Sequence, residues 1–240
     1  MNWRERAYQA YFEHYLKIER GDLSKENIKK QFPVWNSYYS RFLPIDKNAS
    51  ILDLGCGNGE LLFWLKLIGF YNARGIDQDL RLIEEAKKLD VKVCKDDIKS
   101  FLSDKSQKFD CIIARDVIEH FTKDEIFEVL DLIYGALRQG GVLIIQTPNA
   151  ESPFGARYRY YDFTHCIGFT SSSLRHVLGA TGFKNITFKE AGPVPHGIIS
   201  LCRFILWRAV VLCINLYLFI ETGSRKGLFT QNIIVRSQKL

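Results

Sequence analysis

The sequence predicts an α/β fold, in which helices cover both faces of a doubly wound, mostly parallel sheet. Short apolar runs alternate along the chain with segments whose apolar residues recur every three or four positions, and glycines separate the two kinds of segment. Parallel strands need crossover connections of this length. The 240 residues, 47% of them apolar, are enough for one well-buried domain with an accessory piece.

The expected elements follow one another in a regular order. Strands are expected at 50–54, 73–76, 91–94, 109–114 and 142–145, where short apolar runs are bounded by polar residues or glycine. Helices are expected at 60–68, 80–89 and 124–137, the first ending at Gly69 and the last before Gly140 and Gly141. Because parallel strands of such a sheet align their carboxyl ends, we expect the ligand at that edge.

Composition narrows the class of protein further. The net charge of +6 is too small to require a polyanionic partner, and residues 197–240 carry +5 of it. The six cysteines form no C-x-x-C pair, so neither a disulfide framework nor a zinc knuckle is expected. The amino terminus lacks the apolar stretch of a signal peptide. We therefore expect a cytoplasmic protein.

The segment Asp53-Leu-Gly-Cys-Gly-Asn-Gly59 follows the first expected strand. Glycines at alternate positions allow a tight turn and a close approach of ligand to backbone, and the next helix presents free N–H groups. Asp77 stands eighteen residues after Gly59, where two carboxylate oxygens can accept both hydroxyls of a ribose. The third glycine comes one residue earlier than in the dinucleotide pattern G-x-G-x-x-G. The spacing therefore favours a cofactor with a single nucleoside.

These residues resemble the first motif, D-x-G-x-G-x-G, of the class I S-adenosylmethionine-dependent methyltransferases. The resemblance covers roughly residues 47–190. It implies a Rossmann-like methyltransferase fold with a seven-stranded sheet, in which a final strand at 229–236 returns beside 183–188. It further continues through Asp77, Asp97-Ile98, Phe109-Asp110, the stretch 116–120 and Gly140-Gly141.

The resemblance also implies the contacts of S-adenosylmethionine. Asp53 would help to place the amino group, and Gly55, Cys56, Gly57 and Gly59 would hold the methionine part. Asp77 would bind the ribose, and Asp97 and Ile98 the edge and face of the adenine, although the neighbouring Asp96 could exchange roles with Asp97. The remaining expected cofactor contacts are Gln78, Ala114 and Asp116.

Methyl transfer to a hydroxyl needs in-line positioning and a base that takes the proton. His120 follows the fourth expected strand, and His165 lies beyond the fifth in the pattern Asp162-x-x-His165. We take His120, His165 and Asp162 as the catalytic candidates.

A metal ion is an alternative. Asp116, Glu119 and His120 share one helical turn, and some ubiquinone-pathway O-methyltransferases that look similar use a divalent ion with such a pattern. A divalent metal is an open alternative but not the expected cofactor.

The acceptor is inferred partly from absent motifs. No Asp-Pro-Pro-Tyr, Asn-Pro-Pro-Tyr or Pro-Cys motif of nucleic-acid methyltransferases occurs, so no nucleic-acid partner is expected. Thr147-Pro-Asn149, the aromatic and basic loop 157–161 and the later pattern resemble methyltransferases of polysaccharide synthesis. The leading expectation is O-methylation of a sugar hydroxyl on a glycan or lipid-linked saccharide. The alternatives are a quinone-like or other lipophilic phenol as acceptor, or a binding protein without turnover.

Two accessory segments flank or interrupt the expected domain, which spans 48–240. Residues 1–47 read as an aromatic-rich helical cap, and 197–224 as a hydrophobic helical insertion. Within it, Ile198–Ile220 approaches the length of a membrane span, but Arg208 near its middle opposes a span. The segment could instead lie at the cytoplasmic membrane surface, with Arg225 and Lys226 attracted to anionic lipid. It could also be buried in a homodimer or against its own domain.

Overall fold

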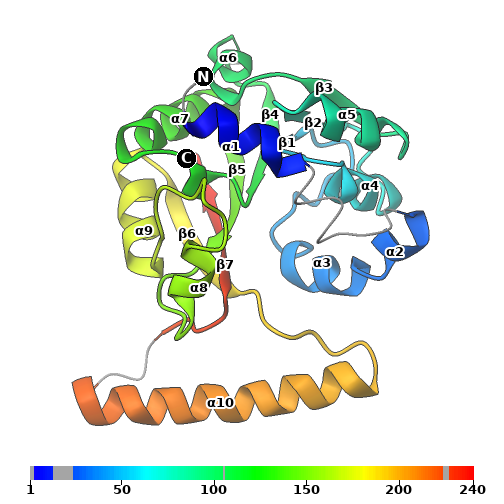
Figure 1. The fold of residues 1–240 in the computed structure, drawn as a ribbon. Coiled ribbons are helices and arrows are strands. Elements are labelled where there is room, and N and C mark those ends of the chain that lie inside the picture. Colours follow the sequence, from blue (N-terminus) through cyan, green and yellow to red (C-terminus); the bar gives the residue numbers. More distant parts are fainter. Residues whose placement is uncertain (1–2, 13–23, 105, 224–226) are drawn as a thin grey trace.

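The computed structural model describes residues 3–104, 106–223 and 227–240 apart from 13–23, and its centre is one seven-stranded sheet (Figure 1). The strand order is β3-β2-β1-β4-β5-β7-β6. The strands are β1 (Ile51–Leu54), β2 (Ala73–Asp77), β3 (Lys92–Lys95), β4 (Phe109–Arg115), β5 (Leu137–Pro148), β6 (Lys184–Glu190) and β7 (Asn232–Gln238).

The sheet has the predicted, mostly parallel topology. β1 pairs in parallel with β2 and β4, and Leu54 stands opposite both Ile76 and Ala114, so the carboxyl ends of these strands are level. β7 runs antiparallel between β5 and β6, which confirms the expected return of the last strand. All four residues of β1 are buried, as expected for a central strand covered on both faces.

Helices form a layer on each face of the sheet. One face carries α6 (Ile98–Ser103), α7 (Lys123–Ala136) and α9 (Ser171–Ala180), which bury apolar side chains such as Leu130 and Leu174 against it. The other carries α2 (Lys25–Lys29), α3 (Phe32–Tyr39), α4 (Glu60–Leu67) and α5 (Leu80–Lys87). There Tyr39 and Trp64 are completely buried. The doubly wound fold is therefore confirmed.

Local capping explains where several helices begin. Thr122 and Glu125 form a capping box at the start of α7, and Asp79 caps α5. A helix was expected around His176, where α9 lies, but none was predicted from the sequence for α6 or α8 (Gly155–Arg159). Asp97 caps α6 and Thr170 caps α9, so side-chain acceptors at these two starts satisfy backbone N–H groups that short helices leave open.

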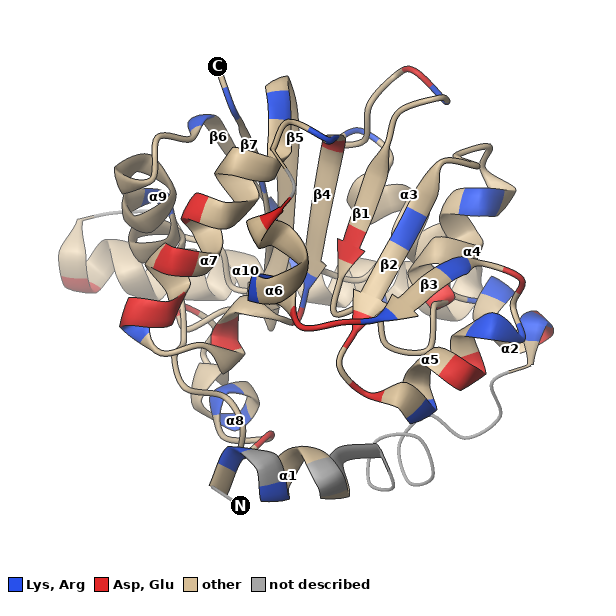
Figure 2. Ribbon diagram, turned by 90° about the horizontal axis from the view of Figure 1, so that it is seen from above, with Lys and Arg blue, Asp and Glu red and all other residues tan. Residues whose placement is uncertain are grey.

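The two accessory segments differ in how they meet this core. Within the expected cap, α2 and α3 contribute Ile28, Trp35 and Tyr39 to the core, whereas α1 (Trp3–Phe12) lies across the carboxyl edge of the sheet (Figure 2). The chain leaves β6 for α10 (Ile198–Thr222), which stands apart from the layers before the chain returns to β7 (Figure 1). Arg225 and Lys226 lie outside the described residues.

Candidate functional site

The three glycines of the loop between β1 and α4 share an unusual backbone conformation but differ in what surrounds them. Gly55, Gly57 and Gly59 have φ of +62°, +53° and +76°, a region that side chains disfavour. A Cβ on Gly55 would come within 2.7 Å of Val117 Cγ2, and one on Gly59 within 2.8 Å of Ala86 Cβ. A Cβ on Gly57 would meet nothing within 4 Å. The first and third glycines thus serve packing, while the second leaves backbone open to a ligand.

Asp77 ends β2 directly beside this loop. Its Oδ2 accepts a hydrogen bond of 2.9 Å from the Gly57 backbone N–H, and its Oδ1 accepts one of 2.9 Å from Asp79 N–H. Burial raises the pKa of the Asp77 carboxyl, against these N–H donors, which lower it. Each carboxylate oxygen retains a second lone pair, so the geometry agrees with a ribose-binding role, which stays a prediction.

Asp53 is the buried carboxyl of the site, at 2% exposure. Burial raises its pKa to about 7; the Arg115 guanidinium counteracts this shift and the Asp77 carboxylate adds to it. A cation such as an ammonium group placed beside Asp53 would favour the ionised form. Arg115 was not predicted from the sequence, because its influence on Asp53 arises between neighbouring strands.

The other expected cofactor residues differ in what they can offer. Asp97 Oδ1 caps α6 by accepting from Lys99 N–H (3.0 Å) and Ser100 N–H (3.1 Å), so this side chain has a structural role as well. The neighbouring Asp96 accepts from the Asp97 N–H. Ile98 is half-buried against the core, and Gln78 is exposed. Cys56 and Ala114 are buried, at 2% and 1% exposure, so any ligand would meet chiefly their backbone.

Asp116 follows β4 with an unusual backbone conformation, φ +56°. Its carboxylate accepts from Gln146 Nε2 at 3.2 and 3.1 Å, and Gln146 Oε1 accepts from the Tyr39 hydroxyl at 2.5 Å. This chain of contacts joins α3, β5 and the end of β4. Tyr39 and Gln146 were missed because the sequence separates them by 107 positions.

A hydrogen-bonded chain orients His120. Asp162 Oδ1 accepts from the Thr164 hydroxyl at 2.6 Å, and Thr164 Oγ1 lies 2.8 Å from His120 Nδ1. Because the hydroxyl hydrogen of Thr164 is directed to the carboxylate, its oxygen accepts from His120, which places the imidazole proton on Nδ1. His120 Nε2 is then left with a free lone pair, the requirement for a base.

Electrostatics keep this imidazole neutral. Burial and the neighbouring His165 lower the pKa of His120 to about 4, although the Asp162 carboxylate acts in the opposite direction. The two histidine rings lie 4.8 Å apart, centroid to centroid. His120 therefore holds no positive charge at neutral pH, and its Nε2 can accept a proton.

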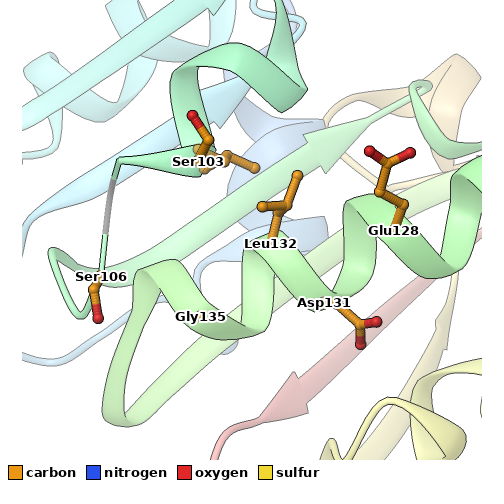
Figure 3. A pocket seen from close by; sticks show the side chains of 7 residues that line it. Ser103, Ser106, Glu128, Asp131, Leu132 and Gly135 are labelled. Atoms are coloured by element: carbon orange, nitrogen blue, oxygen red, sulfur yellow. The ribbon is translucent and has the colours of Figure 1, made fainter.

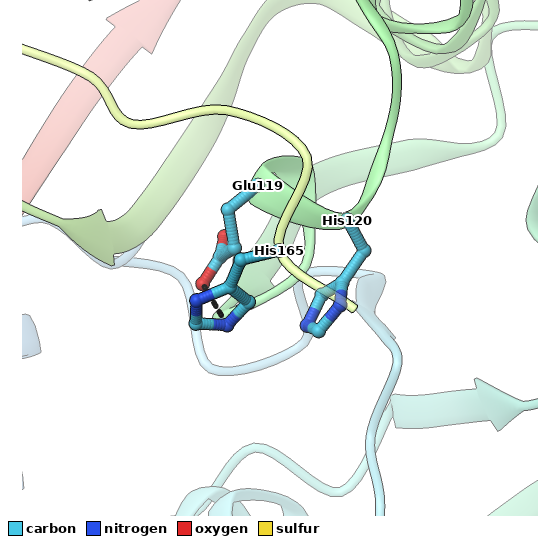
Figure 4. Close-up of side chains that lie close together, drawn as sticks. All are labelled: Glu119, His120 and His165. Atoms are coloured by element: carbon cyan, nitrogen blue, oxygen red, sulfur yellow. Dashed lines mark ion pairs between the residues drawn. The ribbon is translucent and has the colours of Figure 1, made fainter. Parts of the chain in front are cut away.

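Glu119 and His165 complete the cluster (Figure 4). Glu119 is completely buried; its Oε2 accepts from the Thr147 hydroxyl at 3.0 Å, and burial raises its pKa well above the ordinary value. Glu119 Oε1 has no hydrogen-bond partner in the described part of the chain and lies 3.9 Å from His165 Nε2. His165 Nδ1 lies 3.2 Å from the Tyr158 carbonyl oxygen, which makes Nδ1 the donor.

The donor set of this cluster fits a divalent ion. One ligand atom each of Glu119, His120 and His165 lies within 4.8 Å of the others. Both histidines direct their Nδ1 to oxygen partners, as metal-bound histidines do, and Glu119 Oε1 is an unsatisfied acceptor. The alternative metal set changes accordingly, because His165 joins Glu119 and His120 here in place of Asp116.

α1 closes the site from outside. Arg4 forms an ion pair of 2.9 Å with Glu125, and its Nη2 donates to the His120 carbonyl at 3.4 Å. The Tyr8 ring lies 6.2 Å from the His120 ring, and burial raises the Tyr8 pKa to about 12. In Figure 2 α1 lies across the carboxyl edge of the sheet, and the contacts of Arg4 and Tyr8 place it beside the histidine cluster.

The aromatic and basic loop after β5 borders a small hollow of about 150 Å³ lined by Asn149, Gly155 and Arg159, among others. Arg159 donates to the carbonyls of His165 and Cys166 and so holds the loop in place rather than facing solvent as an acceptor-binding group. Large aromatic side chains at the loop surface remain exposed. They are Phe154, Tyr160, Tyr161 and Phe163.

A larger hollow of about 340 Å³ lies elsewhere, between α6 and α7 (Figure 3). It is lined by Ser103, Glu128 and Asp131, among others. None of the predicted site residues borders it, and it lies beside the helices rather than at the carboxyl ends of the strands. We therefore place the candidate active site at the glycine loop and the histidine cluster.

Comparison with known sequences assigns the chain to a family. The sequence pattern of the methyltransferase domain matches residues 28–187, two thirds of the chain. The chain belongs to the methyltransferase domain family. The prediction of a methyltransferase is thus confirmed at the level of the family.

Individual relatives of this methyltransferase domain include two O-methyltransferases. The chain is 33% identical over 133 residues to a ubiquinone biosynthesis O-methyltransferase of Pelagibacter ubique, covering 52% of this chain and 50% of that protein. It is 31% identical over 168 residues to the mitochondrial ubiquinone biosynthesis O-methyltransferase of Rattus norvegicus, covering 65% and 39%. The match thus spans half or less of the length of these relatives.

A solved structure confirms the fold. The SAM-dependent methyltransferase of Archaeoglobus fulgidus aligns with a TM-score of 0.66 at 22% identity, covering 97% of this chain and 100% of that one.

Proposed function

We propose that this methyltransferase domain transfers the methyl group of S-adenosylmethionine to the hydroxyl of a lipophilic phenol. The observation that carries the proposal is the chain Asp162–Thr164–His120, which presents an unprotonated Nε2 beside the cofactor edge of the sheet. The two O-methyltransferase relatives named above support an oxygen acceptor.

The cofactor edge is suited to S-adenosylmethionine. Gly57 offers open backbone, Asp77 can accept from the ribose, and the buried Asp53 can pair with the amino group. Bound there, the cofactor supplies a methyl group on a positively charged sulfur. The residues hold it in one orientation, so that an acceptor oxygen can attack the methyl carbon in line while the carbon–sulfur bond breaks.

His120 then takes the proton of the acceptor. Its Nε2 receives the hydroxyl hydrogen, and the Asp162 carboxylate, acting through Thr164, stabilises the imidazolium that forms. Asp162 and Thr164 are positioning residues in this scheme, and α1 keeps water away from the reacting oxygen.

The weak basicity of His120 selects among acceptors. A base whose pKa is about 4 removes a proton most readily from an acidic hydroxyl. A phenol, with a pKa of ~10, is far more acidic than an aliphatic hydroxyl, which resembles water at ~15.7. A phenol therefore suits this base better than a sugar hydroxyl does, which supports the alternative acceptor of the sequence analysis.

The same cluster has a second use. Glu119, His120 and His165 would hold a divalent ion, which would polarise the acceptor oxygen and lower its pKa. In the proposed route His120 accepts the proton instead of binding a metal ion. Removal of metal ions by a chelator distinguishes these two roles of His120.

The sugar hydroxyl stays a second candidate because of one observation. Tyr160 and Tyr161 are 77% and 59% exposed beside the site, where aromatic rings can stack on a sugar.

The two acceptors are separated by incubating the protein and labelled S-adenosylmethionine with an alkyl-substituted catechol or with a lipid-linked saccharide fraction. We expect label in the catechol alone, and its loss by at least about a hundredfold in His120→Ala. Label in the saccharide alone would refute the phenol, and undiminished transfer by His120→Ala would refute the base.

A further inference from the structure

α10 exposes an apolar surface that the described part of the chain does not cover. It has 25 residues, and the window that qualifies it by length and composition as a membrane helix is only 6% buried, with a mean hydropathy of 1.8. Seven large aliphatic side chains on it are between 57% and 84% exposed. They are Ile198, Ile199, Ile205, Leu206, Leu212, Leu216 and Ile220. Burial of the helix against its own domain, one of the sequence-based alternatives, is therefore wrong for the described residues.

The side chains of α10 divide into two sectors. Ser200, Trp207 and Val211 are turned toward the protein, and Ser200 and Val211 are buried. At ~100° per residue the opposite sector spans about 180° and contains the seven exposed aliphatic side chains. No charged, amide or Ser/Thr side chain falls in this outward sector. The helix is thus apolar on the side that faces away from the domain.

The two arginines of α10 lie at the borders between these sectors. By the same geometry Arg203 and Arg208 are about 140° apart, on either side of the protein-facing stripe. From these borders their long side chains can reach the headgroup level while the outward sector is buried in acyl chains. Anionic lipid would complement them, and the excess positive charge of residues 197–240 has the same sign.

Both ends of α10 are tied to the same side of the domain. The Tyr38 hydroxyl donates to the Gly192 carbonyl before the helix, and Asn149 Nδ2 donates to the Leu228 carbonyl after it. If α10 crossed a bilayer, one connecting coil would have to return through about 30 Å of hydrocarbon with unpaired backbone groups. The helix must therefore lie along a surface instead of spanning it.

A second copy of the chain fits this surface less well than lipid does. One partner helix covers a narrow seam, whereas the apolar sector is about 180° wide and, apart from the Tyr217 hydroxyl near its border, offers no side chain that forms strong directional hydrogen bonds. A fluid acyl layer covers the full width. We infer that α10 lies in the plane of an anionic membrane surface, with its outward sector buried in lipid and its arginines at the headgroups.

This position of α10 also links the membrane to the loop that follows β5. Glu151 Oε2 accepts from the Leu228 N–H, and Glu151 Oε1 accepts from the Ser171 N–H. The chain that leaves α10 is thus joined to the loop that follows β5. Membrane docking does not depend on the proposed acceptor, so the two claims can fail separately.

Vesicle flotation tests the inference directly. We expect the full chain to float with phosphatidylcholine–phosphatidylglycerol vesicles, and Leu206→Glu/Leu212→Glu to lose at least about tenfold in partition coefficient. Ile45→Glu/Tyr71→Glu changes two apolar residues outside α10 that are at least as exposed, and it should float like the wild type. Arg203→Gln/Arg208→Gln should lose about fivefold for each arginine, and only with anionic vesicles.

A fluorescent label distinguishes insertion from adhesion. Cys213 is exposed in the outward sector, and Cys94 is exposed on β3. An environment-sensitive dye on Cys213 should shift to the blue when vesicles are added, and one on Cys94 should not. Three results would each overturn the inference. The wild-type protein could stay in the soluble fraction, or equal shifts could occur at both labels. The third is a dimer in lipid-free buffer that does not float and that Leu206→Glu/Leu212→Glu dissociates. Circular dichroism establishes that the variants are folded.

Discussion

The contribution of Asp53 to the stability of the folded protein depends on pH. In the folded protein burial raises its pKa to about 7, against an ordinary value of 3.8. The folded state therefore holds this proton more tightly than the unfolded state, and the stability it contributes is complete below pH 3.8 and is lost as pH rises to 7. The difference corresponds to ~4 kcal/mol of destabilisation at pH 8.

Asp53→Asn removes the ionisation and with it this cost. At pH 8 we expect the variant to unfold at a temperature at least ~5 °C higher than the wild type, because ~1 kcal/mol shifts the midpoint of a domain this size by about 2–4 °C. At pH 5 the folded Asp53 is neutral but the unfolded one is ionised, so ~2 kcal/mol of the cost remains and the gain should fall to about half or less of its value at pH 8. Thermal unfolding followed by circular dichroism measures both, and Asp131→Asn, which removes an exposed carboxylate, is the matched control.

The same variant should lose cofactor binding. Only the ionised Asp53 pairs with an ammonium group, so the affinity of the wild type for S-adenosylmethionine should rise about tenfold between pH 5.5 and 7. Asp53→Asn should bind weakly at both values. An equal change in midpoint at pH 5 and pH 8, or an unaltered affinity, would refute the reasoning.

Three further predictions concern the histidine cluster and its cover. Thr164→Val should lower kcat at least about tenfold without changing affinity for S-adenosylmethionine, and Thr164→Ser should restore the rate; a Ser variant as slow as Val would contradict the hydrogen-bonded chain. Chelation with EDTA should leave at least half of the rate, whereas complete loss reversed by added Mg²⁺ or Zn²⁺ would assign the cluster to a metal. Arg4→Met should raise the KM for the acceptor several-fold by loosening α1, with unfolding unchanged within ~1 kcal/mol, because the broken ion pair with Glu125 is partly exposed; an unchanged KM would exclude a covering role.

The sequence predicted the fold well because its signals are local. The strands of the central sheet are short apolar runs, and the glycine loop is recognisable from seven consecutive residues. The position of β7 in the sheet was predicted from the family resemblance, because the residues 229–236 do not by themselves indicate which strands they pair with. α6 was not predicted because Asp97 was not considered as an N-cap.

The arrangement of the candidate site was less accessible. Thr164 meets His120 across 44 positions, and Tyr39 meets Gln146 across 107, so only the folded chain brings them together. His165 was singled out, but its position beside Glu119 was not, since the loop that carries it has no periodicity to fix its path. Asp162-x-Thr164 was a usable signal, because an Asp side chain often accepts from the residue two positions on.

The central claim is that a nucleoside cofactor lies against the backbone at Gly57. Isothermal titration with S-adenosylhomocysteine, comparing Gly57→Ala with Gly140→Ala, tests it most directly. Both glycines have positive φ and open space at the Cβ position, so both substitutions strain the backbone alike, but Gly140 lies at the opposite end of the sheet. We expect wild-type affinity in Gly140→Ala and at least a tenfold loss in Gly57→Ala. Equal affinities in the two variants, or no binding to the wild type, would contradict the account.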